Sequence, residues 1–216
     1  MTGFLIRYVA LGDSTGVGVG ACDGKGGYVE RLFQRARSNG LSVGLLNLCR
    51  NGATASTLVA DQLDKAVRAK PTLVTLAVGG NDLWRGTSEA QYAQNTERTI
   101  AALASTGTRG IVINVPDLSH APVAGLVPVH MYGPRLLAFN EALKASAAKH
   151  RFEYVDLFSQ SRADLPGHPE YFCADGFHPS EHGYDRWTSY VWPTFERVAR
   201  ELSAPSASAP TSVPHR

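Results

Sequence analysis

Short apolar runs alternate with amphipathic segments along almost the whole chain. The apolar runs are rich in Val, Ile and Leu and cover residues 5–11, 42–48, 72–78, 110–115 and 152–158. Runs of this length and composition are typical of strands that are buried on both faces of a sheet. The segments between them carry apolar residues three and four positions apart, which predicts helices over 28–39, 57–70, 89–106, 134–150 and about 181–202, the last with a bend near Pro193.

This alternation predicts one α/β domain, a three-layer α/β/α sandwich with a five-stranded parallel sheet of flavodoxin-like type. In such sheets, ligands bind in the loops at the carboxyl ends of the strands. The unusual stretches of the chain fall in those loops: GDSTG, CRNGATAS, GGNDLW, PDLSHAPVAGLVPVHMYG and CADGFHPSEHGY, in strand order. The sequence therefore predicts that one site is built from five loops at one edge of the sheet.

Composition and charge limit the extent of this domain, its classes of partner and its cellular compartment. The chain has 216 residues, 44% of them hydrophobic, which suits one domain over residues 1–203 followed by a disordered Ala-, Pro- and Ser-rich tail over 204–216. The net charge of +2 comes from interspersed charges, which argues against a nucleic-acid partner, and no run is long enough to span a membrane. Arg7 interrupts the apolar start, and the three cysteines form no CxxC pair, so we expect a cytoplasmic protein. Nothing in the composition indicates an oligomeric state.

The first loop, within residues 8–20, is open to three interpretations. A dinucleotide loop needs G-x-G-x-x-G and an acidic residue after the second strand, and the chain has neither. GDSTG matches the G-x-S-x-G elbow of α/β-hydrolases letter for letter. That elbow normally has strands before it, whereas here the serine follows the first strand, so we regard this match as accidental. The third interpretation is a different serine-nucleophile loop.

Two rival chemistries involve residues near the C-terminus. Residues 178–182 read HPSEH, which fits the H-x-x-E-H signature of a zinc peptidase. Pro179 favours the first turn of a helix and so places His178 at or before its start, which does not suit two zinc ligands on one helical face. Cys173 is a conceivable alternative nucleophile. We interpret His182 and His120 as surface residues.

Four blocks in order along the chain resemble the SGNH (GDSL-type) serine hydrolases, a family of esterases and lipases. These blocks are GDS after the first strand, a glycine after the second, GGND after the third and D-x-x-H near the C-terminus. The resemblance extends from Tyr8 to about Trp187, and Thr15 departs from the leucine in the family name. The four signature positions are Ser14, Gly52, Asn81 and His178.

Serine chemistry gives these residues distinct roles. A serine hydroxyl becomes a good nucleophile only when a base takes its proton, and His178 is the candidate base for Ser14. Asp175 lies three residues before His178 and can hold its imidazole in the correct tautomer. The resemblance further implies an oxyanion hole formed by the backbone N–H groups of Ser14 and Gly52 and the side-chain amide of Asn81. This chemistry requires no metal and no organic cofactor, and we expect Asp13 and Asp82 only to brace their loops.

The substrate is expected to be a small-molecule or acyl ester. Trp84, Met131, Tyr132 and Phe177 lie on or beside the loops and are candidate substrate-binding residues. The stretch over residues 116–133 is unusually long for a connection, and we expect it to decide which acyl group binds. Two alternatives stay open: an acyltransferase using the same residues, and a non-catalytic binding module on the same fold.

Overall fold

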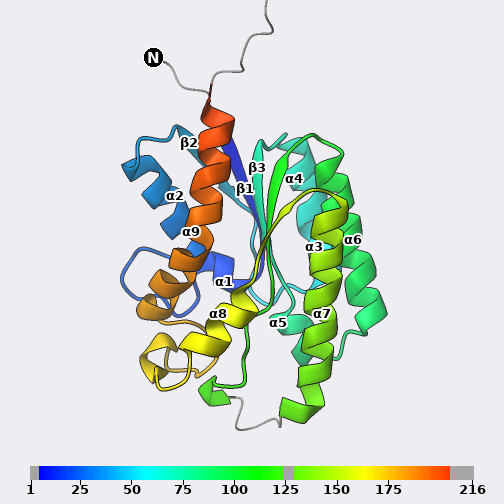
Figure 1. Ribbon diagram of the computed structural model, residues 1–216, viewed down its shortest axis with the longest axis vertical. Helices are drawn as coiled ribbons and strands as arrows, with labels where there is room; N and C mark the ends of the chain where they lie inside the picture. Colours follow the sequence, from blue (N-terminus) through cyan, green and yellow to red (C-terminus); the bar gives the residue numbers. More distant parts are fainter. Residues whose placement is uncertain (1–4, 124–128, 205–216) are drawn as a thin grey trace, which may run out of the picture.

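Five parallel strands form the centre of the computed structural model, which describes residues 5–123 and 129–204 (Figure 1). The strand order is β2-β1-β3-β4-β5, and every neighbouring pair is parallel. This arrangement confirms the predicted five-stranded parallel sheet. The strands are β1 (Ile6–Gly12), β2 (Val43–Asn47), β3 (Leu73–Ala77), β4 (Arg109–Ile113) and β5 (Glu153–Val155).

Helices cover both faces of the sheet, and the alternating side chains of the strands divide the interior into two cores. Tyr8 and Ala10 of β1 belong to the core under α2 and α9, whereas Val9 and Leu11 belong to the core under α3, α4, α6 and α7. Figure 1 shows these two helical layers on opposite sides of the sheet. The helices are α1 (Ser14–Val17), α2 (Tyr28–Ser38), α3 (Ala55–Leu58), η1 (Val59–Leu63), α4 (Asp64–Arg68), α5 (Gly80–Trp84), α6 (Glu89–Ala104), α7 (Val129–Lys149), α8 (Leu157–Asp164), η3 (Pro169–Tyr171) and α9 (Glu181–Ser203).

The strand order places a crevice at the carboxyl ends of β1 and β3. The chain leaves β1 toward β2 on one side and then returns past β1 to form β3 on the other. The loops that follow β1 and β3 therefore depart to opposite faces of the sheet, which is where ligands bind in folds of this type. Ser14 follows β1 with only Asp13 between them, and Asn81 follows β3 within α5.

Two predicted elements have a bound that differs from the structure by at least three residues. The run 152–158 was expected to be one strand, but β5 ends at Val155 and α8 begins at Leu157. Asp156 ends the strand because its side chain caps α8 and accepts a hydrogen bond from the Ser159 N–H at 3.1 Å. The helix expected from residue 134 begins at Val129, so Pro134 lies inside α7 and the preceding connection is shorter than predicted.

The helical stretch between β2 and β3 is interrupted by a π-helical turn. Residues 55–68 form α3, the π-helical η1 and α4 without a break. A π turn adds a residue to the helical cycle and so rotates the side chains that follow, and such turns are frequent at functional sites. In this chain, the π turn carries the buried Gln62 toward the end of β1.

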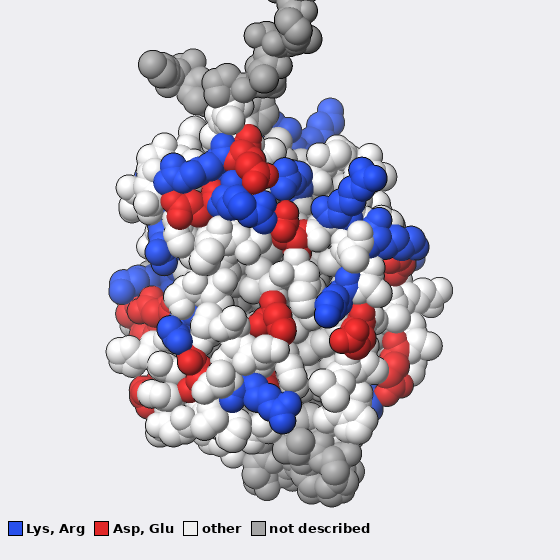
Figure 2. Space-filling view, in the orientation of Figure 1, with Lys and Arg blue, Asp and Glu red and all other residues white. Residues whose placement is uncertain are grey.

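On the face of the molecule that Figure 2 shows, positive and negative side chains are mixed and no stripe of one sign runs across it. None of the helices in the described ranges combines the length and the apolar character that crossing a membrane requires. The predicted disordered tail lies outside the described residues, apart from Ala204.

Candidate active site

The candidate nucleophile lies at the sharp turn between β1 and α1. Ser14 is the first residue of α1 and is only 5% exposed. Asp13 caps this helix, and its carboxylate accepts hydrogen bonds from the Thr15 N–H at 3.0 Å and from the Thr15 hydroxyl at 2.8 Å. Burial raises the pKa of Asp13, and these hydrogen bonds oppose the rise. A side chain at position 16 would overlap the Cys49 thiol, so the turn requires Gly16.

A second turn brings an imidazole and a carboxylate to this serine. The Nε2 atom of His178 lies 2.8 Å from Ser14 Oγ, and its Nδ1 atom lies 2.6 Å from an oxygen of Asp175. These distances fit a tautomer in which Nδ1–H donates to Asp175 and Nε2 accepts from the Ser14 hydroxyl. The serine and the histidine are 164 positions apart in the sequence, so the contact arises only in the fold.

Asp175 is held in its ionised form by the turn that carries it. Its second oxygen accepts the backbone N–H groups of Phe177 and His178, each at 2.8 Å. Partial burial alone would raise the pKa of Asp175, but the hydrogen bonds from the His178 side chain and these N–H groups outweigh it and hold the pKa well below its usual range. The turn is closed by a hydrogen bond from the Cys173 N–H to the His178 carbonyl at 2.9 Å.

The loops after β2 and β3 meet beside Ser14. The Asn81 side chain donates one N–H to the Ala53 carbonyl at 3.0 Å, which fixes the orientation of its amide. Asp82 is fully buried, and both of its oxygens accept the Ala55 N–H, at 2.9 and 3.2 Å. Burial raises the pKa of Asp82 to about 6, against the lowering effect of the Ala55 N–H. Gly52 has a φ of +71°, in the left-handed region that favours glycine.

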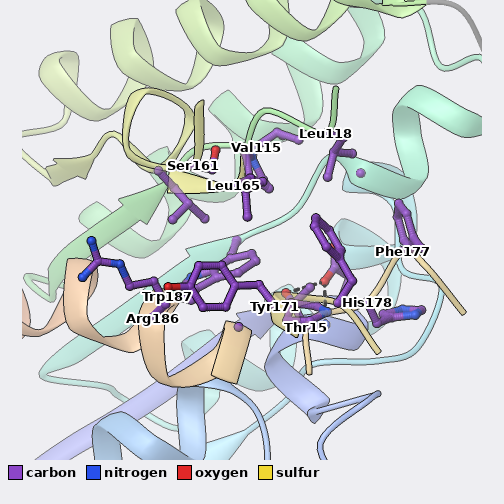
Figure 3. Close-up of a pocket in the computed structure, with 18 of the residues that line it drawn as sticks. Thr15, Val115, Leu118, Ser161, Leu165, Tyr171, Phe177, His178, Arg186 and Trp187 are labelled. Carbon is purple, nitrogen blue, oxygen red and sulfur yellow. Dashed lines mark hydrogen bonds between the residues drawn. The ribbon is translucent and has the colours of Figure 1, made fainter. Parts of the chain in front are cut away.

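An apolar pocket leads away from these residues and lies between α8, α9 and the loop after β4 (Figure 3). It holds about 920 Å³ of empty space, open solvent at its mouth included. Ser14, Asn81 and His178 line one part of it. The apolar residues that line the rest include Val115, Leu118, Leu157, Leu165, Phe177 and Trp187.

The pocket also has a charged region. Asp164, Arg186 and Tyr190 all line it, and Asp164 accepts hydrogen bonds from both Arg186 and Tyr190. In Figure 3, Arg186 and His178 lie on opposite sides of the pocket, with Tyr171 between them. The pocket therefore runs from the serine, past apolar side chains, to a hydrogen-bonded ion pair.

The four predicted substrate-binding residues fall in different places. Phe177 lines the pocket. Trp84 is 37% exposed and packs with ring centroids 6.0 Å from Phe177 and 5.9 Å from the buried Tyr132, and neither Trp84 nor Tyr132 is among the described lining residues. Met131 belongs to the first turns of α7, where side chains lie outside what the structure describes.

Several other candidates stand apart from this arrangement. His120 and His182 are exposed, on the loop after β4 and on α9. Cys173 lies near Asp175, and burial raises the pKa of its thiol, which disfavours the nucleophilic thiolate. Within the described ranges, no group of three or more His, Cys, Asp or Glu side chains is placed to hold a metal ion.

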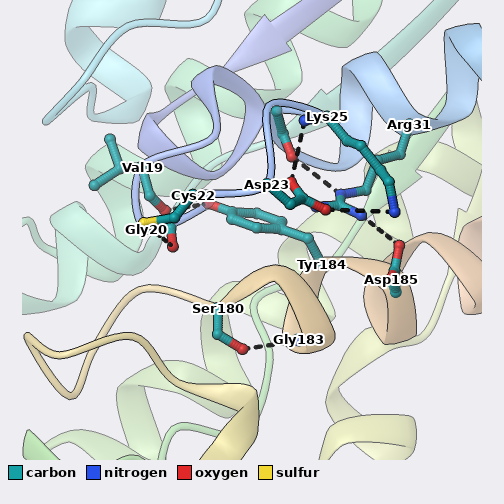
Figure 4. Close-up of polar contacts among 11 residues, drawn as sticks. Val19, Gly20, Cys22, Asp23, Lys25, Arg31, Ser180, Gly183, Tyr184 and Asp185 are labelled. Carbon is teal, nitrogen blue, oxygen red and sulfur yellow. Dashed lines mark hydrogen bonds and ion pairs between the residues drawn. The ribbon is translucent and has the colours of Figure 1, made fainter.

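A buried arginine ties the segment between α1 and α2 to the start of α9 (Figure 4). The Arg31 side chain is 4% exposed, and its guanidinium donates to both oxygens of Asp23 at 2.9 Å and also to Asp185. The Tyr184 hydroxyl donates to the Val19 carbonyl at 2.7 Å. These contacts join the region that follows Ser14 to the helix that follows His178.

Sequence reasoning missed the residues that α8 contributes. Leu157 and Ser161 of α8, and Leu165 directly after its last residue, line the pocket. The available signal was Asp156, because Asp is a favoured N-cap residue and its side chain can accept the N–H of the residue three positions later, here Ser159. The apolar run around it favoured a longer strand instead.

Known proteins resemble this chain along most of its length. Residues 10–186 match the sequence profile of the GDSL-like lipase/acylhydrolase family. The chain is 28% identical over 189 residues to the esterase TesA of Pseudomonas aeruginosa, which covers 87% of both chains.

Solved structures show the same fold. A crystal structure of TesA superposes with a TM-score of 0.74 at 24% identity and covers 89% of this chain and 99% of that one. A lipase/acylhydrolase from Enterococcus faecalis gives a TM-score of 0.72 at 22% identity, with 94% and 100% coverage. A catalytic mutant of an acetylxylan esterase from Geobacillus stearothermophilus gives 0.74 at 17% identity, with 88% and 94% coverage.

Proposed function

The chain belongs to the GDSL-like lipase/acylhydrolase family, and on that premise we propose that it hydrolyses carboxylic esters with Ser14 as the nucleophile. The observation that carries the proposal is the continuous contact from Ser14 Oγ to His178 Nε2, at 2.8 Å, and from His178 Nδ1 to Asp175, at 2.6 Å. A nucleophile, a base and a group that orients the base are the parts that acyl transfer to serine requires.

The reaction proceeds in two halves. Ser14 Oγ attacks the ester carbonyl while His178 Nε2 takes its proton, and the ionised Asp175 stabilises the imidazolium that forms. The tetrahedral intermediate collapses, the C–O bond to the alcohol breaks, and His178 returns the proton to the leaving oxygen. Water then attacks the acyl-enzyme with His178 again as base, which releases the acid and restores Ser14.

The negative charge on the intermediate needs donors that are already in place. We assign these to the backbone N–H groups of Ser14 and Gly52 and to the amide N–H of Asn81 that does not bond Ala53. The fixed Asn81 amide supports this assignment, because a preorganised donor needs no rotation when the charge develops. Asp82 supports it indirectly, since it holds the Ala55 N–H and thereby the loop that contains Gly52.

The apolar pocket between α8 and α9 is the proposed acyl site. It begins at Ser14 and His178, and side chains such as Leu157, Leu165 and Trp187 form its walls. Burying each methylene of an acyl chain there would contribute about 0.8 kcal/mol, or about fourfold in kcat/KM. Phe177 is part of this wall, Trp84 packs against Phe177, and Tyr132 packs against Trp84.

The test is hydrolysis of p-nitrophenyl esters from acetate to palmitate by the wild type, Ser14→Ala and the surface control Ser38→Ala. We expect the wild type and the control to release p-nitrophenol and free acid equally, and Ser14→Ala to release neither above background. Equal activity in Ser14→Ala and the wild type contradicts the mechanism. Release of p-nitrophenol with the acyl group on an acceptor other than water identifies a transferase.

A further inference from the structure

Gln62 is a buried polar side chain on an otherwise apolar helical face. It lies in η1, is 1% exposed, and shares its face with the buried residues Leu58 and Ala66. Its amide makes two hydrogen bonds to one residue: the Gly12 N–H donates to Oε1 at 2.9 Å, and Nε2 donates to the Gly12 carbonyl at 2.8 Å. A buried amide is retained on an apolar face only where its donors and acceptors are satisfied.

At the end of β1, the Gln62 amide makes hydrogen bonds of the kind that a neighbouring strand would otherwise make. The pairing of β1 with β2 stops at Ala10 and Asn47, whereas on the other side β1 pairs with β3 as far as Gly12 and Ala77. Gly12 therefore has a sheet partner on one side only. The Gln62 side chain supplies the hydrogen bonds on the open side, where the Gly12 carbonyl also accepts the Arg50 N–H at 3.1 Å.

Gly12 has no side chain by which the core could hold it. Its φ is +157°, and a Cβ added there would overlap the carbonyl oxygen of Ala77, so Gly12 must be placed through contacts to its own backbone atoms. Gly12 lies two residues before Ser14. The orientation of its peptide groups consequently sets the direction of the turn that carries both the Ser14 hydroxyl and the Ser14 N–H.

The helix that carries Gln62 also begins at the loop of Gly52. Thr54 caps α3, and the Ala55 N–H is held by Asp82. The stretch 55–68 is therefore attached at its start to the loops after β2 and β3, and through Gln62 to the end of β1. This helical stretch therefore connects the loop that contains Gly52 with the turn that contains Ser14, and these carry the two proposed backbone donors.

We propose that Gln62 is a positioning residue for ester hydrolysis, which sets the Ser14 turn relative to the Gly52 loop by clamping the Gly12 peptide groups. This inference rests on the proposed function. Because the oxyanion donors act more strongly on the transition state than on the bound ester, a displaced Ser14 N–H lowers kcat and leaves KM nearly unchanged. A purely structural role would lower the melting temperature without this effect on folded molecules.

The test compares the kinetics of four proteins with p-nitrophenyl butyrate at a temperature where each is folded. Gln62→Met keeps the length and bulk of the side chain but removes both hydrogen bonds. Gln62→Glu, assayed at a pH at which its carboxyl group is ionised, keeps an acceptor for the Gly12 N–H and places an oxygen without a proton against the Gly12 carbonyl. The control is Thr75→Val, which removes a buried hydrogen bond to Tyr8, of 2.8 Å, inside the sheet.

We expect kcat to fall at least about tenfold in both Gln62 variants, since a small misplacement of a catalytic group costs up to about 10²-fold. KM and the Thr75→Val kcat should stay within about threefold of the wild type. A folded Gln62 variant with a smaller loss of kcat overturns the inference, as does an equal loss in Thr75→Val. If Gln62→Met does not fold, Gln62→Glu decides. A wild type without esterase activity removes the proposed function and this inference together, whereas an active wild type with unaffected variants removes only the inference.

Discussion

The substitution Asp175→Asn separates the role of the carboxylate in catalysis from its role in the turn. One oxygen of Asp175 accepts the backbone N–H groups of Phe177 and His178, and the carbonyl oxygen of the substituted amide can accept both in the same way. The other oxygen faces His178 Nδ1 at 2.6 Å, and in Asp175→Asn an NH₂ group takes its place. Two donors cannot face each other, so Nδ1 must give up its proton and become the acceptor.

That exchange reverses the tautomer of His178. The proton moves to Nε2, which lies 2.8 Å from Ser14 Oγ and then donates to the serine instead of accepting its proton. Removing the base in this way costs about 10⁴-fold in kcat, or about 5 kcal/mol of transition-state stabilisation. Because the Asp175 side chain is 45% exposed, the substitution should change the melting temperature little.

The assay measures kcat for p-nitrophenyl butyrate at neutral pH, together with thermal unfolding of each protein. The matched control is Asp64→Asn, an exposed carboxylate on α4, which should retain the wild-type kcat. A folded Asp175→Asn enzyme that loses less than about 100-fold would refute the reasoning, because the proton on Nε2 would then be no obstacle to catalysis.

Three further substitutions test other parts of the site. Asn81→Ala removes one oxyanion donor and should lower kcat by about 10²–10³-fold with folding intact, and an effect confined to KM would contradict this role. Arg186→Leu replaces the positive charge in the pocket with an apolar side chain, so kcat/KM across the p-nitrophenyl ester series should peak at a longer chain than in the wild type; an unchanged peak would place the acyl chain elsewhere. Asp82 has a pKa of about 6 in the folded protein, above its ordinary value, so folding favours its protonated form. Its contribution to the free energy of unfolding is therefore greatest below about pH 4. This contribution declines by up to about 3 kcal/mol as the pH rises to about 6. Urea unfolding should therefore show the wild type losing stability relative to Asp82→Asn over that interval, and parallel pH profiles would refute the assignment.

The sheet and the candidate reacting residues could be predicted from the sequence because both have local signals. Each buried strand is a short apolar run, and its carboxyl end is followed by a loop in which unusual residues stand out. Ser14 and His178 stand out in this way, and the prediction that all five loops meet at one edge needed only the parallel order of the strands.

The pocket could not be predicted because its walls depend on tertiary packing. Strand β5 is only three residues long, and Asp156 starts a helix where the apolar pattern favours a continued strand. The apolar spacing predicted a helix from residue 134, yet α7 begins at Val129. Gln62 looked like any polar residue of an amphipathic helix, and only the π turn and the missing partner of Gly12 reveal its position.

The most direct measurement of the central claim is the intact mass of the protein after exposure to a serine-directed fluorophosphonate, followed by peptide mapping. The wild type should gain one phosphonyl group, on the peptide that contains Ser14. Ser14→Ala should gain none, and His178→Ala should react far more slowly because its serine lacks a base. Modification of another residue, or equal labelling of the wild type and Ser14→Ala, would contradict the account.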